Sequence, residues 1–129
     1  MIPLALVLTS CAGTKPAPPT NNEAYTVERL VDQLPAGVEG VELAKNGLRP
    51  KKGYTVVKDS DSTIAFMRTS DHVAVAGSSC SCWVGVGCIP DPFSDIVTCL
   101  ALPAGCIQCR LVLKYGGIRT EVFQYTKNE

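Results

Sequence analysis

Six cysteines crowd between residues 80 and 109, and no other feature of this chain constrains its fold as strongly. Their spacing is C-x-C-x5-C-x10-C-x6-C-x2-C, at Cys80, Cys82, Cys88, Cys99, Cys106 and Cys109. An even number of cysteines in a small domain is typical of a disulfide framework, for which six cysteines allow 15 pairings. We expect up to three disulfides, in which Cys80 and Cys82 bond to different partners.

A zinc or iron–sulfur site is the main alternative, because a C-x-C pair and a C-x-x-C pair together offer four thiolates. The ligands would be Cys80, Cys82, Cys106 and Cys109. This spacing differs from the paired C-x2-C of a zinc ribbon, and two thiols would be left over. Residues 80–109 also contain no Lys, Arg or His that could compensate for the thiolate charge. We therefore expect no metal and no other cofactor.

A thiol–disulfide exchange protein is the second alternative, because Cys106 and Cys109 form a C-x-x-C motif. In thioredoxin-like proteins this motif begins a helix, whose dipole lowers the pKa of the first thiol. Residues 110–115 instead alternate between polar and apolar side chains, which predicts a strand. The single histidine, His72, follows Asp71 but has no further catalytic partner in the sequence pattern. We expect no enzymatic activity.

The N-terminus carries a second informative pattern. An apolar run at residues 2–8 leads directly into Leu8-Thr9-Ser10-Cys11. This tetrapeptide resembles the lipobox of bacterial lipoproteins, in which small residues before the cysteine allow cleavage and the thiol receives a diacylglycerol. The resemblance implies that residues 1–10 are the remnant of a signal peptide and that Cys11 is the lipidated first residue of the mature protein.

The residues after the lipobox suit a membrane tether. Residues 11–22 are rich in Pro, Thr and Asn, which is typical of an extended linker, and residues 23–129 would then form a single small cysteine-rich domain. The lipoprotein resemblance implies a cell-envelope location, with the membrane as a partner through the lipid. Ala12 stands where an Asp commonly retains lipoproteins at the inner membrane, which implies the outer membrane if the organism is Gram-negative. Disulfides persist in such an oxidising compartment.

Charge balance argues against nucleic acid as a partner. Twelve Lys and Arg residues match twelve Asp and Glu residues, so the chain lacks the basic excess that a nucleic acid attracts. With no catalytic pattern in view, we expect a structural or binding role, in which an envelope protein is a candidate partner.

Hydrophobic periodicity predicts an α+β or mainly β fold. Apolar side chains at residues 22–34 lie near the helical period and predict an N-terminal helix, and residues 40–49 predict a short second helix or a turn. The period then changes to two, which predicts an antiparallel meander with strands at residues 54–58, 63–68 and 72–76. Gly116-Gly117 separates two further alternating runs and predicts a hairpin.

The cysteine block is apolar and interrupted by Gly and Pro, so we expect an irregular disulfide-rich lobe that covers one face of the small sheet. Trp83, the only tryptophan, lies within it. We expect Trp83 to pack on a disulfide, and it becomes a candidate binding residue if it is exposed. The stretch K-x-G-Y-x-x-V-K-x-S-D, which starts at Lys51, is similar to one in small uncharacterised bacterial cysteine-rich proteins, and this resemblance implies no activity.

Overall fold

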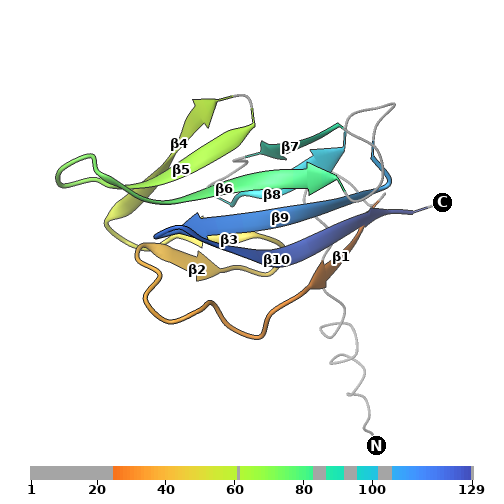
Figure 1. The fold of residues 1–129 in the computed structure, drawn as a ribbon, viewed down its shortest axis with the longest axis horizontal. Coiled ribbons are helices and arrows are strands. Elements are labelled where there is room, and N and C mark those ends of the chain that lie inside the picture. The colour runs from red at the N-terminus through yellow and green to blue at the C-terminus, as the bar shows by residue number, and fades with distance from the viewer. Residues whose placement is uncertain (1–24, 61, 83–86, 92–95, 102–105, 129) are drawn as a thin grey trace, which may run out of the picture.

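The computed structural model describes residues 25–128, apart from residue 61 and the segments 83–86, 92–95 and 102–105 (Figure 1). The described part of the chain is mainly β and contains no helix. Its largest element is a six-stranded antiparallel sheet with the strand order β1-β10-β9-β6-β5-β4. These strands are β1 (Tyr25–Arg29), β4 (Tyr54–Ser60), β5 (Thr63–Arg68), β6 (Ala74–Cys82), β9 (Gln108–Tyr115) and β10 (Ile118–Lys127).

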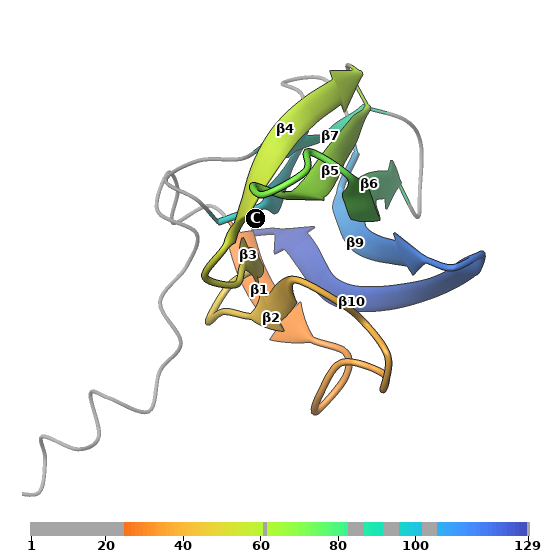
Figure 2. The same cartoon turned by 90° about the vertical axis from the view of Figure 1, so that its left-hand side faces the viewer.

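Two small antiparallel pairs pack against one face of this sheet. The first joins β2 (Val41–Leu43) to β3 (Leu48–Pro50), and the second joins β7 (Cys88–Asp91) to β8 (Thr98–Ala101). Figure 2 shows that the large sheet is curved and that the small pairs lie on its inner side. We call the face that they cover the inner face, and the opposite face the outer face.

The predicted N-terminal helix is wrong. Residues 25–29 form strand β1, which pairs with the end of β10 in a register that places Tyr25 opposite Lys127. Tyr25 and Val27 stand two residues apart, a spacing that suits a strand as well as a helix. Without β1, strand β10 would be the edge of the sheet, with unpaired backbone N–H and C=O groups. Residues 25–29 become a strand because they form hydrogen bonds with these groups.

The segment at residues 40–49 is a hairpin, formed by β2 and β3, rather than a second helix. Its loop is closed by a hydrogen bond from the Ala44 amide to the Gly47 carbonyl, at 2.8 Å. Backbone hydrogen bonds of 3.0 and 2.7 Å then tie Leu48 to Val97. A side chain at position 47 would collide with the Val97 carbonyl oxygen, so only glycine allows this close approach.

The Gly-Gly hairpin and the first two strands of the predicted meander are confirmed, whereas the third strand begins at Ala74 rather than at residue 72 and extends to Cys82. Strands β4, β5 and β6 are neighbours in the sheet, and β9 turns into β10 at Gly116-Gly117. Both glycines have positive φ, of 53° and 82°, as a two-residue turn between twisted strands requires.

The core lies between the inner face and the two small pairs. Strands of the large sheet contribute the largest buried side chains, and β3 and the segment before β8 add Leu48 and Val97. Burying one such side chain stabilises the fold by about 1.5–3 kcal/mol. The fully buried set includes Ile64, Phe66, Leu111, Leu113, Val122, Phe123 and Tyr125.

One buried hydroxyl has a defined partner within this core. The Tyr125 hydroxyl donates a 2.6 Å hydrogen bond to the Asn46 carbonyl oxygen, which fastens β10 to the β2–β3 loop. Burial raises the pKa of Tyr125, so this donor stays protonated.

Candidate functional site

The six cysteines between residues 80 and 109 form three disulfides. The pairs are Cys80–Cys99, Cys82–Cys106 and Cys88–Cys109, with Cα–Cα distances of 5.8, 5.8 and 5.9 Å. Cys80 and Cys82 bond to different partners, as expected. The block therefore acts as a covalent staple within the described residues.

Two of the three bridges join the β7–β8 pair to the large sheet. Cys80 of β6 bonds to Cys99 of β8, and Cys88 of β7 bonds to Cys109 of β9. The third bridge ties the end of β6 to the residue two positions before β9. Since β7 and β8 are short, these covalent links supply much of what holds them on the inner face. Within the described residues, the lobe that was expected to be irregular thus contains a regular β7–β8 pair held by disulfides.

The metal set predicted from the sequence does not come together as four thiolates. Its members are divided among the three disulfides, and a sulfur in a disulfide is not the thiolate that zinc or iron requires. The sulfurs of Cys82, Cys88 and Cys106 do lie within 4.8 Å of one another. The disulfides Cys82–Cys106 and Cys88–Cys109 therefore lie side by side. These sulfurs could bind a metal only after both disulfides are reduced.

The C-x-x-C motif has a different geometry from that of a thiol–disulfide exchange protein. Cys106 and Cys109 bond to different partners instead of to each other, and both are fully buried. Strand β9 begins at Gln108, so the motif leads into a strand, and no helix of the described residues provides a dipole at these sulfurs.

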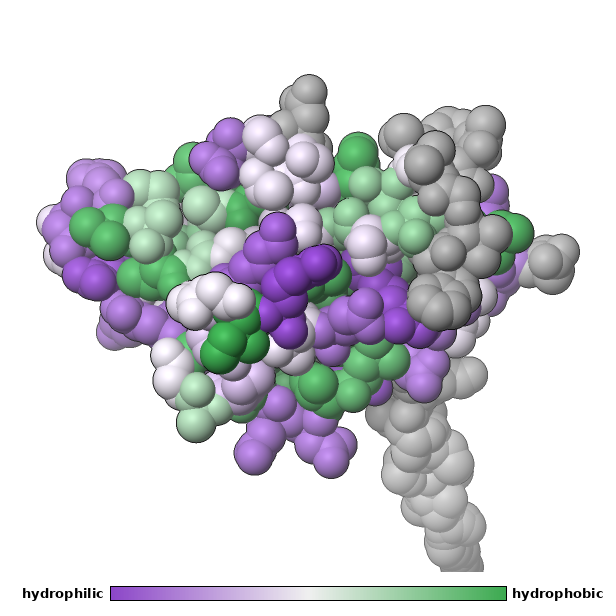
Figure 3. Space-filling view, in the orientation of Figure 1, coloured by the Kyte–Doolittle hydropathy of each residue, from purple (hydrophilic) through white to green (hydrophobic). Residues whose placement is uncertain are grey.

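The outer face of the sheet is open and polar, and it is the second candidate site. Figure 3 shows that the most hydrophilic side chains on this side of the molecule gather over β9 and β10. The register places small outer residues of β6 beside them, with Gly77 opposite Lys114 and Ser79 opposite Val112. Long side chains on β9 and β10 therefore stand beside the short side chains of β6, and this difference in height leaves hollows on the outer face.

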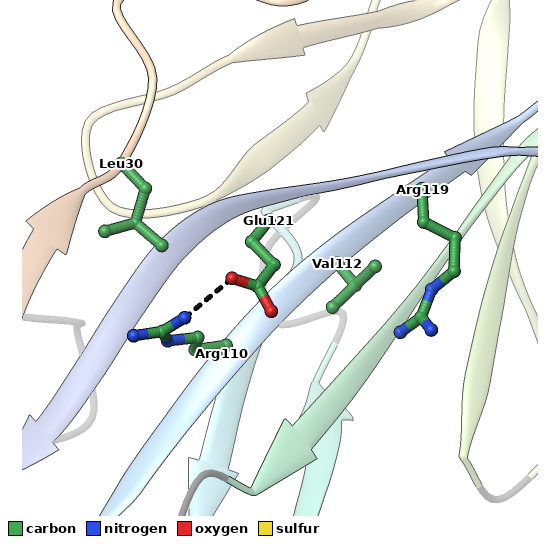
Figure 4. Close-up of a pocket in the computed structure, with 5 residues that line it drawn as sticks. All are labelled: Leu30, Arg110, Val112, Arg119 and Glu121. Carbon is green, nitrogen blue, oxygen red and sulfur yellow. Dashed lines mark hydrogen bonds and ion pairs between the residues drawn. The ribbon is translucent and has the colours of Figure 1, made fainter.

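The first hollow has a volume of about 620 Å³ and is lined by Leu30, Arg110, Val112, Arg119 and Glu121 (Figure 4). A 2.7 Å ion pair joins Arg110 Nη1 to Glu121 Oε1. Arg119 lies on the other side of Val112 and has no such partner in the close-up. This hollow thus combines an apolar floor with one neutralised cation and one cation that stays open to a ligand.

The second hollow, of about 440 Å³, lies beside the β9–β10 turn. Its lining comes from the start of β6 and from the turn, and includes Val75, Lys114, Tyr115, Ile118 and Arg119. Arg119 lines both hollows. The two hollows are therefore neighbours that share this residue.

A surface ion cluster at the β5–β6 turn is structural in character. Glu39 accepts hydrogen bonds from the Tyr54 hydroxyl at 2.6 Å and from Arg68 Nε at 2.9 Å. The hydrogen bond from Tyr54, and to a smaller extent the one from Arg68, lowers the pKa of Glu39. The hydrogen bond between Tyr54 and Glu39 also raises the pKa of Tyr54. The cluster fastens the loop before β2 to the edge of the sheet.

Asp71 and His72, the only acid–base neighbours found in the sequence, do not form a catalytic pair. Asp71 forms a 2.7 Å ion pair with Arg68. It also accepts a 3.2 Å hydrogen bond from the Val73 amide. His72 is exposed and has a φ of 58°, so it occupies a turn rather than a strand.

Cys11, with the tether at residues 11–22, and Trp83 lie outside the described residues. Within the part that is described, no helix is long and apolar enough to cross a membrane. Comparisons of the chain with protein-family models, curated proteins and solved structures find no match.

The basic residues of the outer face were missed in the sequence. A usable signal existed: the predicted Gly-Gly hairpin, with its two-residue turn, places Lys114 opposite Arg119 without any tertiary information. The hollows themselves were not visible, because they depend on the small residues of β6, which is distant from β9 in the sequence.

Proposed function

We propose that this protein is a lipid-anchored component of the cell envelope, whose disulfide-stapled β domain has a structural or binding role and no chemistry of its own. The observation that carries this proposal is the cysteine pairing. All six cysteines of the described residues bond among themselves, so the seventh in the sequence, Cys11, has no disulfide partner left within the chain.

An odd cysteine in an oxidising compartment is exposed to unwanted pairing unless it is modified. The lipobox resemblance of Leu8-Thr9-Ser10-Cys11 supplies such a modification, since transfer of a diacylglyceryl group converts the thiol into a thioether. Two acyl chains on one residue also provide stable membrane attachment, which a single chain does not. Together with the disulfides, this reasoning supports an extracytoplasmic location.

Lipid labelling tests the anchor. The full chain, exported in a bacterium that is fed radiolabelled palmitate, is expected to carry label and to sediment with membranes. Cys11→Ser should lose the label and move to the soluble fraction, whereas Ser10→Ala should behave like the parent, because alanine keeps a small residue before the cysteine. Label on the Cys11→Ser protein, or unchanged sedimentation, would contradict the proposal.

The intact mass of the same protein tests whether three disulfides form. Three disulfides make the protein six hydrogens lighter than its reduced form, and no cysteine of the block should react with an alkylating agent before reduction. Six alkylatable thiols with stoichiometric zinc or iron would instead favour the metal-binding alternative.

A further inference from the structure

Two cations face each other at the β9–β10 turn without a counter-charge from the described residues. Arg119 and Lys114 are register partners on the two strands, and both are exposed. Neither side chain makes an ion pair or hydrogen bond with another of the described residues, and the nearby Glu121 is already paired with Arg110 at 2.7 Å. Like charges directly opposite each other destabilise an antiparallel pair. An anion placed between them would remove this repulsion.

Apolar surface lies next to the two cations. Val75, Tyr115 and Ile118 line the 440 Å³ hollow together with Lys114 and Arg119. Val75 stands two residues before Gly77, the register partner of Lys114, so its side chain lies on the same face of the sheet as the two cations. The volume is within the range of small-molecule sites, roughly 300–1,000 Å³, and the combination of an apolar wall with a few convergent polar groups is typical of them.

We infer that this junction binds an amphiphilic anion, in which a carboxylate or phosphate head is joined to an apolar body. Lys114 and Arg119 hold the head, since a guanidinium can donate two parallel hydrogen bonds to either group. The apolar body lies in the hollow against Val75, which stands on the same face of the sheet as the two cations. The inference deepens the binding role proposed above and does not depend on the lipid anchor.

Other features of the molecule agree with a ligand of this kind. A second copy of the chain is a poor occupant, because docking two of these faces would bring four cations together. The site also lies far from the start of the described chain: Tyr25 pairs with Lys127 at one end of β10, whereas the turn stands at the other end (Figure 1).

Titration of the full chain carrying Cys11→Ser tests the inference with four probes. Octanoate and octyl phosphate combine a head with a body, inorganic phosphate is a head alone, and 1-octanol is a body alone. Saturable binding of the two amphiphilic anions is expected by calorimetry, with amide shift changes centred on Gly117 and Arg119. Comparison of octanoate with octyl phosphate then identifies the preferred head.

Variants locate the site. Arg119→Gln and Lys114→Gln should each weaken octanoate or octyl phosphate binding about tenfold, because each removes a charged hydrogen-bond donor. Lys52→Gln is the matched control, since it removes an exposed cation next to the distant edge strand β4. Arg119→Glu should abolish binding and yet raise the melting temperature, because it replaces a repulsive cross-strand pair with an attractive one.

Three outcomes would overturn the inference. Equal binding of 1-octanol would show an apolar cavity without anion recognition. Equal loss in Lys52→Gln would show nonspecific attraction by net charge. Absence of binding by both amphiphilic anions in a folded protein would exclude this ligand class, while the lipid-labelling result and the proposed envelope location would stand unaffected.

Discussion

The two faces of strand β9 perform different tasks. On the inner face, Cys109, Leu111 and Leu113 are all fully buried, and Cys109 is part of a disulfide. On the outer face, Arg110 and Lys114 reach towards solvent beside the hollows. Because the side-chain period of a strand is two, one segment can stabilise the fold with one set of residues and offer a binding surface with the other. Stability and recognition are therefore separable by mutation.

Reduction of the disulfides should produce the largest effect on the inner face. Each bridge in a small domain contributes about 2–4 kcal/mol, so losing three of them removes an amount comparable to the whole stability of a typical domain. Circular dichroism melting curves with and without a phosphine reductant measure this change. The reduced protein is expected to unfold, or to melt at a much lower temperature. An unchanged melting temperature would show that the disulfides of the inner face do not stabilise the fold.

Neighbouring residues of β10 provide the next test. Phe123 is fully buried on the inner face, and Phe123→Ala should lower the free energy of unfolding by about 3–5 kcal/mol. Gln124 lies on the outer face and bonds to Arg110 at 3.0 Å, so Gln124→Ala should cost less than about 1 kcal/mol. Urea denaturation measures both variants. Similar losses would show that the two faces do not differ as proposed.

The smallest expected effect concerns surface charge. Because the folded-state pKa of Glu39 is lowered from 4.5, its contribution to stability is present above that pH and is lost as the pH falls through the folded value. The melting temperature of the parent should therefore fall more steeply in acid than that of Glu39→Gln. Glu42→Gln, which breaks another surface ion pair, is the control. If the melting temperatures of the parent and of Glu39→Gln fell equally steeply with decreasing pH, the lowered pKa of Glu39 would be contradicted.

Several elements could be predicted from the chain because their causes are local. Alternation at residues 54–58 and 63–68 led to two strands of the meander, and Gly116-Gly117 led to the hairpin, since only positive φ closes so short a turn. The even cysteine count in the block led to the disulfides. The candidate site was largely missed, although the hairpin register already implied that Lys114 and Arg119 face each other.

What the sequence determined by itself is the set of local preferences: strand periodicity, turn chemistry and the presence of six cysteines that can pair. The tertiary structure alone decided which of 15 pairings forms, and it made a strand of residues 25–29 by pairing Tyr25 with Lys127. The physical reason is the same in both cases. Contacts between residues far apart in the chain depend on which edges and faces the rest of the fold leaves available, and local propensity is too weak to oppose them.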